Sequence, residues 1–514
     1  MRQIVLSLWL LLLIAACQTS QPISTPAGAE NIELTILQMN DVYEIAPLEG
    51  GKAGGLARVA SVKKALLKEN PNTIAILAGD FLSPSFVGTL RNDEGERIAG
   101  QQMVETLNAL GLDYVTFGNH EFDISDPLLL KKRMDQSQFE YISCNAFWLK
   151  DGKQQAFVQK VNGQDRPVPK YIIRTFKNSQ GKSMKVGFIG VVLPFSKQDY
   201  LVYSDVEESF RQAYEEIKSQ VDICIGITHL DVVEDQKLAA AVPGVALFIG
   251  GHDHTNMNHY VENTIITKAD ANAKTVYVHR LTFNPPSGMF QIRSSLLPID
   301  ESIADDPVTK TVVDRWQKKV NVLMDQMGFD PDRKLLTISE PLVCKEALVR
   351  TQSTNFGRLA TSAMSAAIPG ADVYLMNGGS MRLDDNLFNI VTEYDVLRTF
   401  PFGGPIVTME IPGNSLLQLL DTGLKTNRGD GGYLQLIQAE FKDNVYLING
   451  ARLQANKNYK IILPEFLAQG KEQNLAFLGD FSYEKKEHFL IDGKEVKNDI
   501  RNIVIAYFLR LGSY

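Results

Sequence analysis

Cysteine, basic clusters and internal repeats are scarce in this sequence, and each shortage excludes a class of protein. Cys17 lies near the N-terminus, and Cys144, Cys224 and Cys344 are the others among 514 residues. At most one disulfide can therefore form in the body of the chain, which excludes a disulfide scaffold. The formal net charge is -8 with no long Lys/Arg run, which argues against a nucleic-acid polymer as partner. No repeat recurs at solenoid periods.

The first seventeen residues predict an export signal. Arg2 precedes an apolar run over residues 4–14, which is too short to span a membrane. Ile14-Ala15-Ala16-Cys17 resembles a bacterial lipobox, which implies cleavage before Cys17 and lipid attachment to its sulfur. The alternative is an ordinary signal with an incidental cysteine. We expect export in both cases, and the lipobox implies a lipid-anchored periplasmic or cell-surface protein. Residues 18–31, rich in Ser, Thr and Pro, predict a flexible tether.

The rest of the chain predicts two globular units of mixed helix and strand. Residues 32–300 alternate short apolar runs with amphipathic stretches, which is typical of an α/β or layered α+β domain. Residues 301–335 are charged, with Pro307 near the start, and predict a helical interdomain linker. A second, smaller unit with glycine-rich turns follows at 336–514. The strands expected in the first unit cover residues 34–39, 73–78, 114–117, 185–192, 222–228 and 245–249.

Five of these expected strands are followed at once by a polar residue that can bind a metal. These residues are Asp41, Asp80, Asn119, His229 and His252. Residues placed after the carboxyl ends of strands converge on one edge of a sheet, where open α/β folds bind ligands. With His254 they form an oxygen- and nitrogen-rich set suited to zinc, manganese or cobalt. Asp80 is the natural bridge between two ions, because a carboxylate can give one oxygen to each.

The ordered motifs resemble those of the calcineurin-like metallophosphoesterases, and the second unit extends the resemblance to the 5′-nucleotidase and UDP-sugar hydrolase family over nearly the whole mature chain. The resemblance implies a four-layer β-sandwich flanked by helices, followed by a smaller mixed α/β domain that binds substrate. The motifs that carry it are Asn40-Asp41, Gly79-Asp80, Gly118-Asn119-His120-Glu121, Thr228-His229 and Gly250-Gly251-His252-Asp253-His254.

The same resemblance implies two divalent metal ions and a catalytic pair. One ion is held by Asp41, Asp80 and His254, and the other by Asp80, Asn119, His229 and His252. His120, paired with Asp123, is then the catalytic dyad that stabilises the transition state or protonates the leaving oxygen. The sequence departs from the family at Tyr43, where the first motif normally has a histidine ligand. Tyr43 then binds the metal as phenolate, contacts it through a water, or leaves the first site with a low affinity for metal. Glu44 is a possible substitute ligand.

In the second unit the resemblance implies a nucleotide pocket. Arginines suit phosphate through their planar fork of donors, and the aromatic residues would sandwich the base. The family continues with an aspartate that holds the ribose, whereas this chain has Glu472 in the corresponding loop. Glu472 either replaces that aspartate or the ribose contact is lost, and Asp430 lies too early in the chain for the role. The implied substrate-binding residues are Arg350, Asn377, Arg382, Phe402 and Phe466.

These observations predict an exported, metal-dependent phosphoester hydrolase that acts on nucleotides, with no obligate protein partner. The alternatives within the enzyme class are hydrolysis of UDP-sugars, of 2′,3′-cyclic nucleotides, or of another phosphate or sulfur ester. An alternative of another class is a nucleotide-binding lipoprotein with impaired catalysis, which Tyr43 and the altered loop at Glu472 suggest.

Overall fold

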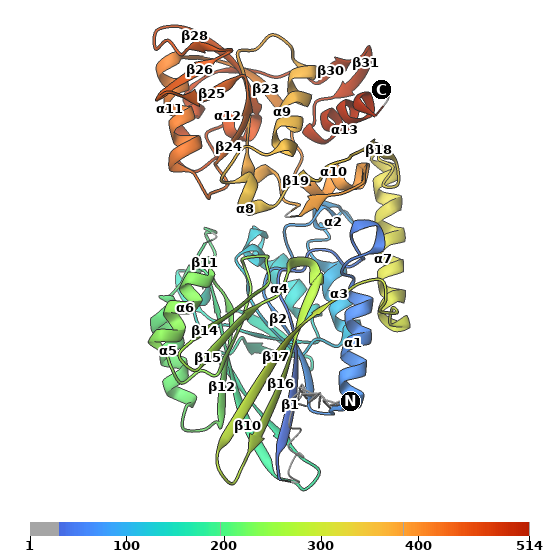
Figure 1. Cartoon of the computed structure of the whole chain (residues 1–514), viewed down its shortest axis with the longest axis vertical. Helices are drawn as coiled ribbons and strands as arrows, with labels where there is room; N and C mark the ends of the chain where they lie inside the picture. The colour runs from blue at the N-terminus through green and yellow to red at the C-terminus, as the bar shows by residue number, and fades with distance from the viewer. Residues whose placement is uncertain (1–29, 196, 384, 513–514) are drawn as a thin grey trace, which may run out of the picture.

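The computed structural model describes residues 30–195, 197–383 and 385–512. The predicted lipidation site Cys17 and nearly all of the predicted tether lie outside these residues. Two domains are stacked along the long axis of the molecule, and helix α7 runs along one side (Figure 1). In the described part of the chain, no helix combines the length and apolarity needed to cross a membrane.

The first domain is built on two six-stranded sheets. In the first sheet, β1, β2, β3 and β4 are parallel neighbours, and β16 pairs antiparallel with β1. The central strands are apolar on both faces because both faces are covered. The strands of this sheet are β1 Ile32–Met39, β2 Thr73–Ala78, β3 Tyr114–Thr116, β4 Glu140–Ile142, β16 Thr275–Asn284 and β17 Met289–Pro298.

The second sheet has the order β14-β15-β13-β12-β10-β9, with β10, β12, β13 and β15 parallel. All six strands expected from the sequence are present in the two sheets, with ends within two residues of those predicted. The strands of the second sheet are β9 Tyr171–Lys177, β10 Ser183–Val192, β12 Ile223–His229, β13 Leu247–Gly250, β14 Met257–Val261 and β15 Thr264–Lys268.

Apolar side chains join these sheets and their helices into four layers. Ile76, Phe188 and Ile225 belong to the core between the two sheets. The first sheet is covered on its outer face by α1 (Leu56–Glu69), α3 (Gln101–Leu110) and α4 (Pro127–Gln136), and the second by α5 (Val206–Ile217) and α6 (Val232–Ala241). The predicted four-layer sandwich is therefore confirmed.

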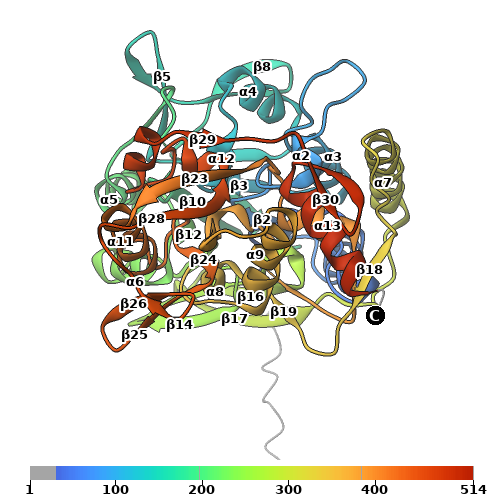
Figure 2. The same cartoon turned by 90° about the horizontal axis from the view of Figure 1, so that it is seen from above.

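Helix α7 (Pro307–Gln326) is the helix predicted for the linker, and it is part of the first domain's outer layer. Asp306 caps it by accepting a hydrogen bond from the Thr309 amide at 3.0 Å, with proline at the first helical position. Trp316 packs into the core shared with α1 and α3, and its indole donates to Glu105 at 2.9 Å. Figure 2 shows α7 at the edge of the molecule beside α3.

The second domain is a mixed α/β unit around a five-stranded sheet of order β24-β20-β28-β23-β29. Its strands are β20 Val373–Asn377, β23 Ile406–Pro412, β24 Leu434–Ile437, β28 Asn458–Pro464 and β29 Tyr483–Glu484. Its helices are α8 Glu346–Val349, α9 Asn355–Ala367, α10 Glu393–Thr399, α11 Gly413–Asp421, α12 Glu465–Ala468 and α13 Ile500–Leu511. Cys144, Cys224 and Cys344, which span both domains, are buried free thiols.

Candidate active site

The residues predicted at the strand ends meet at one edge of the first domain's sheets. Asp41 Oδ1 lies 3.1 Å from His254 Nε2, and Asp80 Oδ2 lies 3.2 Å from His229 Nε2. Asn119 Oδ1 lies 3.2 Å from His229 Nε2 and 3.1 Å from His252 Nδ1. All six predicted metal-binding residues therefore lie in one continuous cluster, as the convergence of strand ends requires.

The backbone of this cluster is strained. Asp41, Asp80, His252 and His254 have φ values of 54°, 56°, 81° and 57°, in the left-handed region that L-residues rarely adopt. Such conformations persist where the surrounding structure over-determines them, and they gather at functional sites. Close packing adds to the constraint: a Cβ on Gly118 would lie 2.0 Å from Asp80 Oδ1.

The donor atoms of this cluster fit a divalent cation. Ligand atoms of Asp41, Asp80 and His254 lie within 4.8 Å of one another. Asp41 Oδ1 is buried beside His254 Nε2 yet accepts no hydrogen bond from the described residues, as expected of two donors that converge on an ion. His229 Nδ1 donates to the Ala78 carbonyl at 2.7 Å, which fixes the ring so that Nε2 faces Asp80.

The charged groups of the cluster shift one another's pKa values. Burial raises the pKa of Asp80, but His229 and His120 outweigh it and hold that pKa far below its usual range. Burial, reinforced by the His229 charge, lowers the pKa of His252 to about 3. His252 is therefore neutral at physiological pH, which is the form that binds metals.

Tyr43 occupies the position of the histidine expected from the family motif. Its hydroxyl donates to Asp80 Oδ2 at 3.1 Å and lies 3.1 Å from His254 Nε2. Burial and the charge of Asp80 raise the pKa of Tyr43 well above its ordinary value, so the residue is a neutral phenol. Glu44, the possible substitute, accepts a hydrogen bond from the Tyr394 hydroxyl of the second domain at 3.0 Å.

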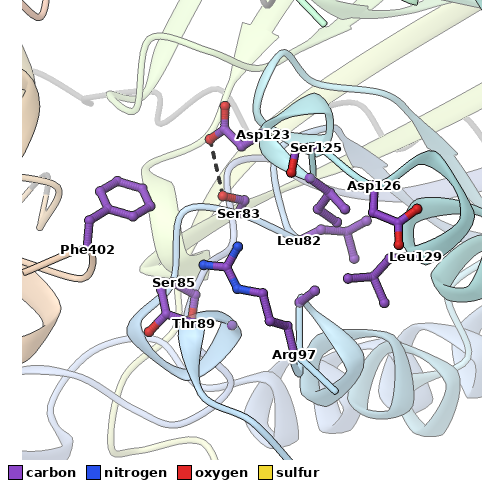
Figure 3. Close-up of a pocket in the computed structure, with 13 residues that line it drawn as sticks. Leu82, Ser83, Ser85, Thr89, Arg97, Asp123, Ser125, Asp126, Leu129 and Phe402 are labelled. Carbon is purple, nitrogen blue, oxygen red and sulfur yellow. Dashed lines mark hydrogen bonds between the residues drawn. The ribbon is translucent and has the colours of Figure 1, made fainter. Parts of the chain in front are cut away.

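His120 and Asp123 form the predicted pair in a single 3₁₀ turn, η2 (His120–Asp123). His120 Nδ1 lies 2.8 Å from Asp123 Oδ2, and the His120 amide donates to Asp80 Oδ1 at 2.8 Å. Ser83 also donates to Asp123, at 3.1 Å (Figure 3). Burial lowers the pKa of His120, but Asp123 and Asp80 more than offset this, and the net shift is upward.

A cleft of about 660 Å³ lies between the two domains and joins this pair to the predicted substrate residues. The side chains of Phe402 and Phe466 line the cleft and are 55% and 46% exposed. Arg382 Nη2 lies 2.9 Å from His120 Nε2, so the second domain reaches the dyad directly. A smaller pocket, in which Phe402 faces Ser83 and Arg97, adjoins the cleft at Asp123 (Figure 3). The cleft is lined by His120, Asp123, Arg350, Asn377, Arg382, Phe402, Phe466 and Glu472.

Comparison with known proteins identifies both domains. Residues 34–256 match the family model of the calcineurin-like phosphoesterases, and residues 336–478 match that of the 5′-nucleotidase C-terminal domain. The chain belongs to the 5′-nucleotidase family. It is therefore a metal-dependent phosphoester hydrolase of the 5′-nucleotidase type.

Named relatives of this family are distant in sequence. The chain is 25% identical over 546 residues to a snake venom 5′-nucleotidase of Gloydius brevicauda, covering 92% of this chain and 87% of that protein. It is 24% identical over 443 residues to the trifunctional nucleotide phosphoesterase YfkN of Bacillus subtilis, covering 80% of this chain but 29% of that longer protein. The structure of a 5′-nucleotidase precursor from Thermus thermophilus shares the fold, with a TM-score of 0.71, 20% identity, and coverage of 93% of this chain and 97% of that one.

Three charged residues of this 5′-nucleotidase-type site were given no role by the sequence analysis. The first is Glu121, which is buried beside the dyad. Its carboxylate accepts hydrogen bonds from four backbone amides, including those of Asp80 at 2.9 Å and Gly118 at 2.6 Å. Burial and the Asp80 charge raise its pKa to about 7. Glu121 thus ties together the loops after β2 and β3, and its place within the Asn119-His120-Glu121 motif was the signal for it.

The second is Lys268, a fully buried cation at the end of β15. It donates to the carbonyls of Leu230 at 2.5 Å and Gly251 at 2.8 Å, and it pairs with Asp235 at 2.8 Å and with Asp253. Burial lowers its pKa, but the two carboxylates outweigh this and keep it charged. One ammonium group therefore links the loop after His229 to the turn that carries His252 and His254.

The third is Glu346, which faces the arginines of the cleft. It forms an ion pair with Arg350 and lies 3.8 Å from Arg382 Nη1. Although burial opposes the charge, the two arginines hold the pKa of Glu346 well below its usual range. Glu472, which also lines the cleft, accepts a hydrogen bond from Asn377 at 2.7 Å, and Asp430, set aside on its sequence position, is a lining residue too.

Proposed function

We propose that the protein hydrolyses phosphoesters of nucleotides, with two divalent ions in the first domain and substrate selection in the second. The observation that supports this best is the cleft, which joins the His120 and Asp123 pair to two arginines and two exposed phenylalanines of the other domain. We take the first domain as residues 32–300 and the second as 336–514, joined through 301–335.

Six residues would hold the ions. Asp41, Asp80 and His254 would bind one, and Asp80, Asn119, His229 and His252 the other, with Tyr43 donating to the shared carboxylate of Asp80. When bound, two such ions supply Lewis-acid activation of a water and neutralise charge on the phosphoryl oxygens.

The protein's own groups position the ester and handle the proton. His120, held by Asp123 at 2.8 Å, donates a hydrogen bond or a proton to the oxygen that leaves phosphorus. Arg382 and Arg350 bind anionic oxygens of the nucleotide through paired N–H groups. Phe402 and Phe466 stack on the base, which favours nucleotides without selecting strongly among them.

The proposal includes export. The signal over residues 1–17 directs the chain out of the cytoplasm, and lipid attachment to Cys17 anchors it to a bacterial membrane at the periplasmic or cell-surface side.

A second candidate substrate class is 2′,3′-cyclic nucleotides. The observation that favours it is Glu472, which is engaged with Asn377 in the place where an aspartate of the family holds the ribose hydroxyls. A cleft that contacts the sugar differently would accept a modified or substituted ribose.

Phosphate release from a panel of nucleoside monophosphates, chromatography of the products formed from UDP-sugars and cyclic nucleotides, and metal content by mass spectrometry together test the proposal. We expect metal-dependent release that His120→Ala lowers by a hundredfold to ten-thousandfold, roughly the typical share of acid–base catalysis. His259→Ala, a histidine on β14 outside the cluster, serves as the control and should retain activity. Equal inactivity of the wild type and His120→Ala with every divalent ion would refute the hydrolase assignment.

A further inference from the structure

The turn between β16 and β17 carries an exposed apolar tip with no charge. Residues 281–292, which close this hairpin, contain no charged side chain. Met289 and Phe290 beside the turn are 70% and 46% exposed, and Pro286 within it is exposed as well. Turns of water-soluble domains are usually polar, and adjoining exposed apolar side chains mark a surface that contacts a partner. We call residues 284–290 the hairpin tip.

The start of the described chain is bound to this tip. The Asn284 side chain donates to Asn31 Oδ1 at 2.8 Å. The Asn178 side chain, in the turn between β9 and β10, donates to the carbonyls of Glu30 and Asn31 at 3.3 and 3.2 Å. Figure 1 shows β1 beginning, and the β16–β17 hairpin turning, at the end of the first domain farthest from the second domain. The segment that precedes residue 30 therefore joins the protein at the hairpin tip.

This position lies a short chain away from the predicted lipid anchor. Residues 18–29 join Cys17 to the described part of the protein. A flexible coil of that length has an end-to-end distance of roughly 20 Å. A lipid attached to Cys17 would thus keep the hairpin tip close to the bilayer surface. Because the tether makes the contact intramolecular, even a weak apolar contact would be well populated.

The side chains around the tip suit the interface of a phospholipid bilayer. Methionine and phenylalanine can enter the boundary between headgroups and acyl chains, and lysines can reach anionic headgroups through their flexible stems. Positive charge exceeds negative charge only slightly here, so the apolar side chains would supply most of the contact. The exposed charged residues of the β9–β10 hairpin and of the first described residues are Lys177, Lys182 and Lys185 against Glu30 and Glu33.

We propose that the hairpin tip docks on the surface of the bilayer that holds the lipid anchor. This inference rests on the export and lipid attachment in the proposed function. Docking would also orient the active site. Strand β1 starts beside the tip and leads to the metal cluster, and its 8 residues span about 26 Å. The cleft would therefore open away from the membrane, toward nucleotides in the aqueous compartment.

A fluorescent label on the lipoprotein in vesicles tests this. Met289→Cys places a thiol on the tip, and an environment-sensitive dye would label it selectively, because the other cysteines of the two domains are buried. Leu490→Cys is the matched control, since Leu490 is 68% exposed on β30 (His488–Ile491) of the second domain. In vesicles of phosphatidylethanolamine and phosphatidylglycerol, we expect blue-shifted emission and quenching by spin-labelled lipid at position 289, and neither at position 490.

A charge at the tip should prevent docking. In protein labelled at position 289, Phe290→Asp should abolish the quenching by spin-labelled lipid, because a carboxylate resists transfer out of water. Leu490→Asp adds the same charge at the far end of the molecule and should leave the quenching unchanged. The proposal is overturned if the two charged variants behave alike.

It is also overturned if the labels at positions 289 and 490 give the same emission and quenching, which is the result expected if a protein partner covers the tip. Flotation of the protein with the vesicles reports on the anchor, and protein that does not float refutes both the anchor and the docking. Phosphate release from adenosine 5′-monophosphate on the same vesicles reports on hydrolysis. Failure of the hydrolase function and failure of docking are therefore distinguishable.

Discussion

Replacing Lys268 with methionine should lower both the free energy of unfolding of the first domain and the affinity of its cluster for metal ions. Lys268 bridges two carbonyls and two carboxylates between the loop after His229 and the turn with His252 and His254. Removing one partner of a buried ion pair costs roughly 3–5 kcal/mol of the free energy of unfolding, because the other charge stays buried without compensation. Removal of a group that orients metal ligands lowers the affinity for the metal by roughly 10–100-fold.

The matched control is Lys63→Met in the same domain. Lys63 is also buried and contacts a carbonyl, that of Gly111, and a carboxylate, that of Asp113 at 2.9 Å, away from the cluster. Both variants should lose stability in urea denaturation, whereas only Lys268→Met should lose affinity for zinc or manganese in competition with a fluorescent chelator. Equal metal affinity in the two variants would refute the assignment of Lys268 as a positioning residue.

Three further predictions concern the cleft, the pH dependence and the ions. Glu346→Gln leaves Arg350 and Arg382 without their internal anion, so KM for nucleoside monophosphates should fall at least tenfold, since hydrogen bonds to charged groups contribute about 1.5–3 kcal/mol. An unchanged KM would contradict this. Burial lowers the pKa of His279 to about 3 in the folded protein. Between about pH 6.5 and pH 3 this histidine is therefore protonated in the unfolded chain but not in the folded one. The free energy of unfolding should fall by about 1.4 kcal/mol for each pH unit as the pH falls through that window. Urea denaturation of the wild type and His279→Gln at pH 7 and pH 5 measures this, and parallel losses in the two would count against it. Chelation should lower the free energy of unfolding by about 2.7 kcal/mol for each ion, relative to protein held with metal at a hundred times its Kd, and calorimetry with and without chelator checks that.

The ends of the strands were predictable from the sequence because apolar residues change to polar ones there. An apolar run followed at once by Asp41, Asp80 or Asn119 gives both the end of the strand and the donor. The parallel order of the strands then brings these residues to one edge, so local pattern and topology reinforce each other.

Residues that support the donors were not predictable in the same way. Lys268 and Glu346 are charged residues whose partners lie in other loops, and nothing in their own neighbourhoods distinguishes them from solvated side chains. Asp430 could not be predicted either, because it lines the cleft although its position in the sequence does not match the expected loop. The linker helix was predicted as a helix, but its burial through Trp316 depended on a surface supplied by α1 and α3.

The left-handed backbone of the cluster restricts which metals the site can be redesigned to hold. Among residues with a side chain, asparagine, aspartate and histidine enter that conformation most readily, and the cluster residues found in it are aspartates and histidines. Converting His252 or His254 to cysteine or methionine, the donors that select copper(I) and other soft ions, would meet a conformational penalty before any coordination began. The backbone conformation therefore limits which amino acids can serve as metal ligands at these positions, independently of how strongly their side chains bind the ion.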